Sequence, residues 1–224
     1  MTFNFNVKGI TPKDIAQGSG SGSTSGGASS TTLVAEIMNG TVVDLNNNEV
    51  MEVRKNFFDS VTSLKTVNLP NATTLGNNAF LKCSELETVN IPKVTTIGDY
   101  AFQYCSKLTN INMSNTQTIG SRAFNSCTSL TSIDLTGVTS LGAASFNSCT
   151  GLKKAWLPSS IETVSASSAS QAPLYKCGSQ LVVYTDLASE ADIPSGWGAN
   201  WNASDSSVKL NVVYGATYED YKNA

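Results

Sequence analysis

Apolar residues recur along the middle of the chain at a constant spacing of 22 residues. Five separate columns keep this step. They are Phe80, Phe102, Phe124 and Phe146; Cys83, Cys105, Cys127 and Cys149; Leu64, Leu86, Leu108, Leu130 and Leu152; Leu75, Ile97, Ile119 and Leu141; and Leu69, Ile91, Met113, Leu135 and Leu157. Such a period is typical of a solenoid, in which each repeat forms one coil and stacking of the coils supplies the core.

Each repeat has two halves with different periodicities. The first half carries apolar residues at helical spacing, and the second half alternates apolar and polar residues as a strand does. In one repeat these positions are Ile97, Ala101, Phe102, Cys105 and Leu108, followed by Asn110, Ile111, Asn112, Met113 and Ser114. The sequence therefore predicts an α/β repeat with one short strand and one short helical turn per coil.

Residues 96–105 and 85–92 resemble the BspA-like class of leucine-rich repeat, whose motif is Ile-Gly-x-x-Ala-Phe-x-x-Cys-x-x-Leu-x-x-Ile-x-Ile-Pro. The resemblance covers roughly residues 57 to 165. It implies a leucine-rich-repeat solenoid of the kind found on the surfaces of gut and oral bacteria. It also implies adhesion or protein binding, and no conserved catalytic residue.

The repeat degenerates at both ends, which predicts a cap at each end of the solenoid. One step before the first clear repeat stand Val42, Leu45, Asn47 and Val53. After Val164 the repeat pattern is replaced, and the tail that holds Trp197 and Trp201 resembles the ending of many BspA-like domains. We expect a solenoid with its N-cap over residues 33–178 and a C-terminal cap over residues 179–224. The alternative for the two tryptophans is an aromatic sugar-binding platform.

Residues 1–32 differ from the rest of the chain. Residues 18–32 are almost entirely Gly, Ser and Thr, which is typical of a flexible linker with a reach on the order of 20 Å. The preceding residues 1–17 combine a strand-like alternation of Phe3, Phe5 and Val7 with a helix start near Pro12. We interpret residues 1–17 as a docking segment for a scaffold protein, and a disordered tail is the alternative.

The outward residues of the predicted strands form two polar rows across the stacked coils. One row is Asn68, Asn90, Asn112, Asp134 and Trp156, and the other is Thr66, Thr88, Asn110, Ser132 and Lys154. These residues are candidate partner-binding residues, with Trp156 as an aromatic anchor. The alternative is an ordinary soluble strand surface whose side chains share hydrogen bonds along the row.

Charge and composition exclude several classes of partner. The net charge is −3 and the chain has no run of Lys and Arg, so we expect no nucleic-acid binding. No apolar run approaches the roughly 20 residues of a membrane-spanning helix. The first residues lack the basic and apolar regions of a signal peptide, so none is visible.

The chain is not expected to be an enzyme or to bind a cofactor. It contains no histidine, which removes Ser-His-Asp and Cys-His nucleophiles and most zinc sites. No Cys-x-x-Cys pair is present, and four of the five cysteines fall at one repeat position. We interpret them as buried, reduced thiols that pack as small apolar groups, with disulfides as the alternative.

Two functions follow from these observations. The first is a binding or adhesion module, extracellular or on a cell surface, which recognises a protein partner or a cell-surface ligand through its polar face. The second is a structural or receptor-binding appendage of a phage particle, anchored to the virion through residues 1–17.

Overall fold

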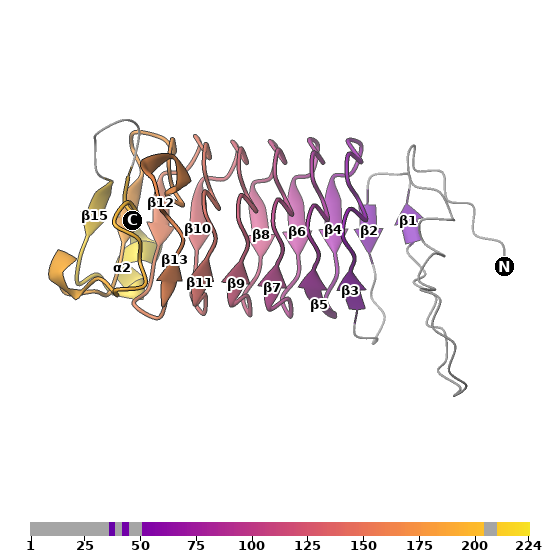
Figure 1. The fold of residues 1–224 in the computed structure, drawn as a ribbon. Coiled ribbons are helices and arrows are strands. Elements are labelled where there is room, and N and C mark those ends of the chain that lie inside the picture. Colours follow the sequence, from indigo (N-terminus) through magenta and orange to yellow (C-terminus); the bar gives the residue numbers. More distant parts are fainter. Residues whose placement is uncertain (1–35, 39–41, 45–50, 204–209) are drawn as a thin grey trace.

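The computed structural model describes residues 36–38, 42–44, 51–203 and 210–224. The predicted docking segment (residues 1–17) and linker (residues 18–32) lie outside the described residues. Within them, the chain winds into a solenoid whose coils stack along one axis (Figure 1). The predicted leucine-rich-repeat solenoid is confirmed.

The described strands form three hydrogen-bonded sheets, and the two that follow each other on the same side of the solenoid are together called the first sheet. In the first sheet the strands are β1 (Glu36–Met38), β2 (Val42–Asp44), β4 (Thr66–Asn68), β6 (Thr88–Asn90) and β8 (Asn110–Asn112), followed by a separate group of β10 (Ser132–Asp134), β12 (Lys154–Trp156), β14 (Val182–Tyr184) and β15 (Asn211–Val213). In the second sheet they are β3 (Met51–Val53), β5 (Ala72–Leu75), β7 (Thr96–Ile97), β9 (Thr118–Ile119), β11 (Ser140–Leu141) and β13 (Thr163–Val164). The neighbouring strands pair in parallel, apart from the antiparallel pair of β1 and β2.

The half of the coil that was expected to be helical folds instead as consecutive turns. Two residues per coil have left-handed backbone, for example Tyr100 at φ 58° and Tyr104 at φ 63°. Every second amide there bonds to the adjacent coil, as the N–H of Phe80 does to the carbonyl of Ala101 at 2.7 Å. A continuous α-helix needs right-handed residues and bonds from each N–H to the fourth residue before it. The turns therefore replace the helix and give each coil a third hydrogen-bonded side.

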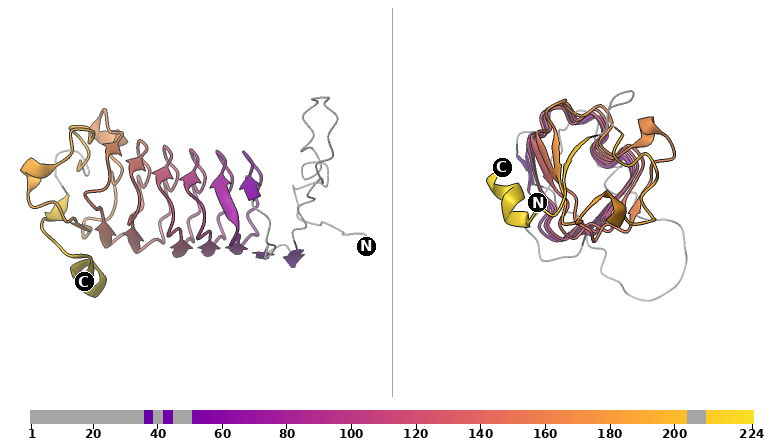
Figure 2. Two further views of the ribbon diagram at one scale, coloured as in Figure 1. Left: turned by 90° about the horizontal axis from the view of Figure 1, so that it is seen from below. Right: turned by 90° about the vertical axis from the view of Figure 1, so that its left-hand side faces the viewer.

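Helical structure among the described residues is confined to the C-terminal region. It consists of the 3₁₀ turns η1 (Ala169–Gln171) and η2 (Glu190–Asp192) and the helix α2 (Tyr218–Asn223). Helix α2 starts with a capping box, in which the hydroxyl of Thr217 accepts from the N–H of Asp220 and the carboxylate of Asp220 accepts from the N–H of Thr217. Viewed along the solenoid axis, α2 lies outside the ring of coils (Figure 2).

A column of phenylalanine rings forms the centre of the core. Adjacent ring centroids lie 4.9 to 5.1 Å apart and the rings are within 13° of parallel. The members are Phe58, Phe80, Phe102, Phe124 and Phe146, all of them buried. The column confirms the predicted aromatic repeat and extends it one coil earlier, to Phe58.

The cysteines form a second buried column beside the rings. The thiols are free, and each donates a hydrogen bond to the carbonyl of a phenylalanine in the preceding coil, at 3.0 to 3.2 Å. Burial raises the pKa of the Cys83 thiol and of the Cys177 thiol to about 12. The predicted packing of the cysteines as reduced thiols is confirmed, and it includes a bond donated by sulfur.

The glycine that precedes each turn half is required by close approach of the coils. A Cβ on Gly98 would lie 2.7 Å from the backbone nitrogen of Asn77 and 2.7 Å from the carbonyl carbon of Gly76. The same contact recurs one coil later, where a Cβ on Gly120 would lie 2.6 Å from the nitrogen of Asp99. The repeated glycine therefore sets the distance between adjacent coils.

The two tail tryptophans lie in the core beside β13. Each is only 5% exposed, and their rings meet edge to face with centroids 4.7 Å apart. The indole Nε1 of Trp197 donates to the carbonyl of Ile161 at 2.6 Å. Because both rings are buried, the alternative of an exposed sugar-binding platform is wrong.

At the N-terminal end of the solenoid, Val42 lies in β2 and pairs with Thr66, whereas Leu45 and Asn47 lie outside the described residues.

Candidate functional site

Strands β4, β6 and β8, the open part of the first sheet, present a polar surface. In β4, β6 and β8 the middle residue of each strand faces the core, so the residues on either side of it face outward. We call this surface the polar face. It consists of Thr66, Asn68, Thr88, Asn90, Asn110 and Asn112.

Side-chain hydrogen bonds join the asparagines of the polar face into a ladder. The amide of Asn112 donates to Oδ1 of Asn90 at 2.8 Å, and the amide of Asn90 donates to Oδ1 of Asn68 at 2.7 Å. Each bond spans 22 residues and thus one coil. The sharing of hydrogen bonds along this row is confirmed for these three residues, and it fixes the orientation of their amide groups.

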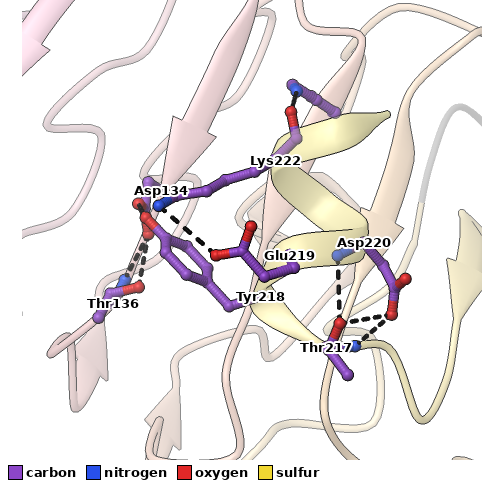
Figure 3. A network of polar contacts seen from close by, with 8 residues as sticks. Asp134, Thr136, Thr217, Tyr218, Glu219, Asp220 and Lys222 are labelled. Atoms are coloured by element: carbon purple, nitrogen blue, oxygen red, sulfur yellow. Dashed lines mark hydrogen bonds and ion pairs between the residues drawn. The ribbon is translucent and has the colours of Figure 1, made fainter.

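The ladder ends where the row reaches Asp134. A carboxylate has no N–H, so Asp134 carries no donor for Oδ1 of Asn112. Its Oδ1 instead accepts from the N–H of Thr136 at 3.0 Å and from the Thr136 hydroxyl at 2.7 Å. Its Oδ2 accepts from the hydroxyl of Tyr218 in α2 (Figure 3).

The remaining part of both rows lies beneath or beside α2, which corrects the prediction for Trp156. That residue is only 5% exposed, so its indole is not an accessible anchor. It belongs to an aromatic cluster separate from the main core, formed by Trp156, Ala216 and Tyr221 with Tyr184 and Tyr218. The rings of Trp156 and Tyr218 meet edge to face at 5.6 Å. The sequence shows that Trp156 points outward, but not that a later helix covers it.

Lys154 also contacts α2 rather than solvent alone. Its Nζ donates to the carbonyls of Tyr221 at 3.0 Å, Lys222 at 3.3 Å and Ala224 at 3.3 Å, which lie at the C-terminal end of α2. A cation is favourable there because the C-terminal end of a helix carries a partial negative charge. Ser132, by contrast, remains exposed in β10.

Two tyrosines of α2, which the sequence analysis missed, hold this arrangement together. The hydroxyl of Tyr221 donates to the carbonyl of Ile133 at 2.9 Å, and burial raises the pKa of Tyr221 to about 12. The hydrogen bond to Asp134 raises the pKa of Tyr218. Both hydroxyls are therefore protonated donors at neutral pH. The signal in the sequence was the capping pattern of Thr217 and Asp220, which marks the start of the helix that holds the two tyrosines.

A groove lies between the open and the covered parts of the first sheet. It has a volume of about 330 Å³ and is lined by residues 109–114 and 132–134 with Thr136, Tyr218 and Tyr221. Its walls thus include Asn110 and Asn112 from the polar face and Asp134 from the edge of the covered part.

Among the described residues, no group of three or more Cys, Asp or Glu residues could hold a metal ion. The buried thiols are protonated, because burial raises the pKa of Cys105, Cys127 and Cys149 well above the ordinary value. Over the same part of the chain, no helix has the length and apolarity needed to cross a membrane.

Comparison with known proteins gives the family of the chain. The BspA type leucine rich repeat region matches residues 51–177 in six copies. A search of the curated proteins finds no relative.

Several solved structures are similar to this one. A leucine rich repeat protein of T. pallidum is 27% identical with a TM-score of 0.58, over 64% of this chain and 68% of that one. A leucine rich cell surface protein from Faecalibacterium prausnitzii is 22% identical with a TM-score of 0.47, over 79% of this chain and 51% of its own length. The pneumococcal vaccine antigen PcpA is 16% identical with a TM-score of 0.48, over 80% of this chain and 45% of its own.

None of these names describes an enzyme. The family match covers more than half of the chain, and the T. pallidum structure shares its fold over about two thirds of it. The chain belongs to the BspA-type leucine-rich-repeat family.

Proposed function

We propose that this chain is a non-enzymatic binding module that recognises a protein partner through the polar face. The observation that carries this proposal is the asparagine ladder. An amide group has two N–H donors and two acceptor positions on its oxygen. The ladder bonds use one N–H of Asn90 and one of Asn112, which leaves their second N–H groups available to a ligand. Because the ladder already fixes these amide groups, the asparagine side chains lose little conformational entropy when a partner binds them.

The position of the polar face also supports a binding role. Side chains of Thr88, Asn90, Asn110 and Asn112 are exposed or half-buried and carry no charge. Helix α2 covers the neighbouring strands but leaves β4, β6 and β8 open. Polar surfaces of this kind suit an interface in which hydrogen bonds give specificity. We propose a cell-surface location, as the resemblance to the BspA-like class of leucine-rich repeat implies.

Substitutions on the polar face test the proposal. Asn90→Ala and Asn112→Ala remove ladder amides, whereas Thr96→Ala and Thr118→Ala alter half-buried residues on the second sheet as matched controls. The four variants and the wild type are compared for capture of surface proteins from candidate cells, and the captured protein is then purified for affinity measurement. We expect Asn112→Ala to weaken binding about tenfold, equivalent to about 1.4 kcal/mol, and the controls to bind normally. Equal binding by all five proteins would refute the role of the polar face.

A second candidate function is an appendage of a phage particle. It is motivated by the strand-like residues 3–7 followed by the Gly/Ser linker of residues 18–32. The test compares the full chain with residues 33–224 for incorporation into particles. Incorporation of the truncated chain would exclude an anchoring role for residues 1–17.

A further inference from the structure

The first sheet is interrupted at one interval, which we call the seam. Strands β6 and β8 are hydrogen-bonded, and so are β10 and β12, but β8 and β10 are not paired. Figure 1 shows a wider interval between β8 and β10 than between their other neighbours in the sheet. On the opposite side of the same two coils, β9 and β11 pair normally. The coils therefore separate only on the side of the first sheet.

Backbone groups on both sides of the seam lack the partners that their equivalents have. One coil earlier, the carbonyl of Glu87 accepts from the N–H of Thr109 at 3.0 Å, and the N–H of Ile91 donates to the carbonyl of Asn112 at 2.9 Å. The corresponding groups at the seam are the carbonyl of Thr109 with the N–H of Thr131, and the N–H of Met113 with the carbonyl of Asp134. Among the described residues, residues 109–113 and 131–135 make no backbone hydrogen bond to each other. Both edges of the seam thus present donors and acceptors.

The volume of the groove at the seam is close to that of a short extended segment. A strand residue occupies on the order of 160 Å³, from a rise of about 3.3 Å, a strand spacing of about 4.8 Å and a sheet spacing of about 10 Å. The groove of about 330 Å³ therefore holds about two residues, close to the three-residue strands of this sheet.

The residues around the seam define the side chains that such a strand would carry. Ile111 and Ile133 face the core on either side, and Asn112 and Asp134 face outward. An inserted strand that continues this pattern has an apolar residue between two polar ones. A polar side chain with an N–H or O–H group would also supply the donor that Oδ1 of Asn112 lacks from Asp134.

We propose that the seam binds one extended segment of a partner protein, which inserts as a strand parallel to β8 and β10. This inference deepens the proposed function and rests on it, because it names the form in which the partner is recognised. The backbone of the segment pairs with both edges of the seam, in the manner of β-strand addition. Its apolar residue enters the core between Ile111 and Ile133, and its polar residues extend the polar face across the seam.

Hydrogen exchange on the full chain tests this proposal with a defined probe. The probe is an acetylated and amidated peptide with the sequence of residues 108–114, which has the required pattern of polar and apolar residues. The matched control is the same peptide N-methylated at two consecutive residues, which removes one backbone donor toward each edge. We expect the probe at millimolar concentration to slow amide exchange in residues 109–113 and 131–135 at least tenfold. Residues 87–91 should exchange as before, and the control peptide should have no effect.

Two outcomes would overturn the proposal. Protection by the N-methylated peptide would show that backbone pairing is not the basis of binding. Absence of protection at the seam would show that the seam does not take an extended chain. In either case the proposed function is judged separately, by whether Asn112→Ala weakens partner binding while Thr118→Ala does not.

Discussion

The hydroxyl of Tyr218 donates a hydrogen bond to the carboxylate of Asp134, which lies 84 residues earlier in the chain. This contact joins the C-terminal helix to the strand at which the asparagine ladder ends (Figure 3). It uses the carboxylate as an acceptor on the side away from Thr136. The same residue therefore ends the polar face and holds α2 beside it.

Tyr218→Phe should loosen α2 without disturbing the coils. A hydrogen bond to a charged group contributes about 1.5–3 kcal/mol when buried, and Tyr218 is half-buried, so we expect a loss of about 1 kcal/mol. Amide exchange in residues 216–224 should become roughly fivefold faster. Tyr104→Phe is the control, since Tyr104 is 46% exposed in a turn. Unchanged exchange in the Tyr218 variant would mean that the aromatic cluster alone holds the helix.

Ser145→Ala should stabilise the protein. The hydroxyl of Ser145 is buried and makes no hydrogen bond to the described residues, whereas the preceding coils have Ala79, Ala101 and Ala123 at this position. Removal of an unsatisfied buried hydroxyl should raise the free energy of unfolding by about 1 kcal/mol, as measured by urea denaturation.

Thr116→Val provides the opposite control for the same measurement. Thr116 is equally buried, but its hydroxyl donates to the carbonyl of Val94 at 2.9 Å. Its loss leaves that carbonyl without the bond, so we expect destabilisation of about 1 kcal/mol. A gain in both variants would contradict the distinction between the two hydroxyls.

The cysteine column should make the fold sensitive to alkaline pH. Unfolded thiols ionise near pH 8.5, whereas burial raises the pKa of Cys83 and Cys177 to about 12 and that of the other three well above the ordinary value. Above pH 8.5 the unfolded chain thus loses protons that the folded chain retains. The free energy of unfolding should fall as pH rises, by about 1.4 kcal/mol per pH unit for each thiol, until the folded pKa is reached.

Cys127→Ala isolates the contribution of one thiol. Urea unfolding of wild type and variant between pH 8 and pH 11 should give parallel curves below pH 8.5. Above it, the variant should show a slope shallower by about 1.4 kcal/mol per pH unit. Identical slopes would mean that the folded and unfolded thiols ionise alike.

Gly98→Ala should disturb coil stacking more than a substitution at an open glycine. A Cβ at Gly98 meets backbone atoms at 2.7 Å, so the adjacent coil must shift, at a cost of about 1–3 kcal/mol. Gly215→Ala serves as the comparison, because its φ of +67° imposes strain but no atom lies within 4 Å of the added Cβ. In thermal unfolding, the midpoint temperature of Gly98→Ala should be lower than that of Gly215→Ala. The reverse order would remove close approach as the reason for the repeated glycine.

Local periodicity was sufficient to predict the solenoid and its core. Phe102 and Cys105 recur because every coil buries the same positions, and burial follows from the sequence pattern alone. The conformation between them was not predictable in the same way. Left-handed backbone falls on Tyr100 and Tyr104, residue types that do not favour it, and the spacing of apolar residues in these turns imitates that of a helix.

The candidate site was predictable only where it depends on neighbouring coils. The Asn68, Asn90 and Asn112 ladder follows from the repeat length, since equivalent residues of stacked coils must be adjacent. The burial of Trp156 depends on Tyr218 and Tyr221, which contact it from outside the repeats. Trp156 and these two tyrosines are not related by the repeat period, so their contact could not be predicted without the tertiary structure.

The even spacing of the phenylalanine column makes the solenoid a molecular ruler. Adding or removing one 22-residue unit would lengthen or shorten the column by one ring interval, which is 5.1 Å between Phe80 and Phe102. Each new junction would reproduce the thiol hydrogen bond, the ring contact and the glycine contact that join the coils of Phe80, Phe102, Phe124 and Phe146. Unequal recombination between two repeats of the gene would therefore yield a chain that still folds. The separation of its two ends would then change in discrete steps.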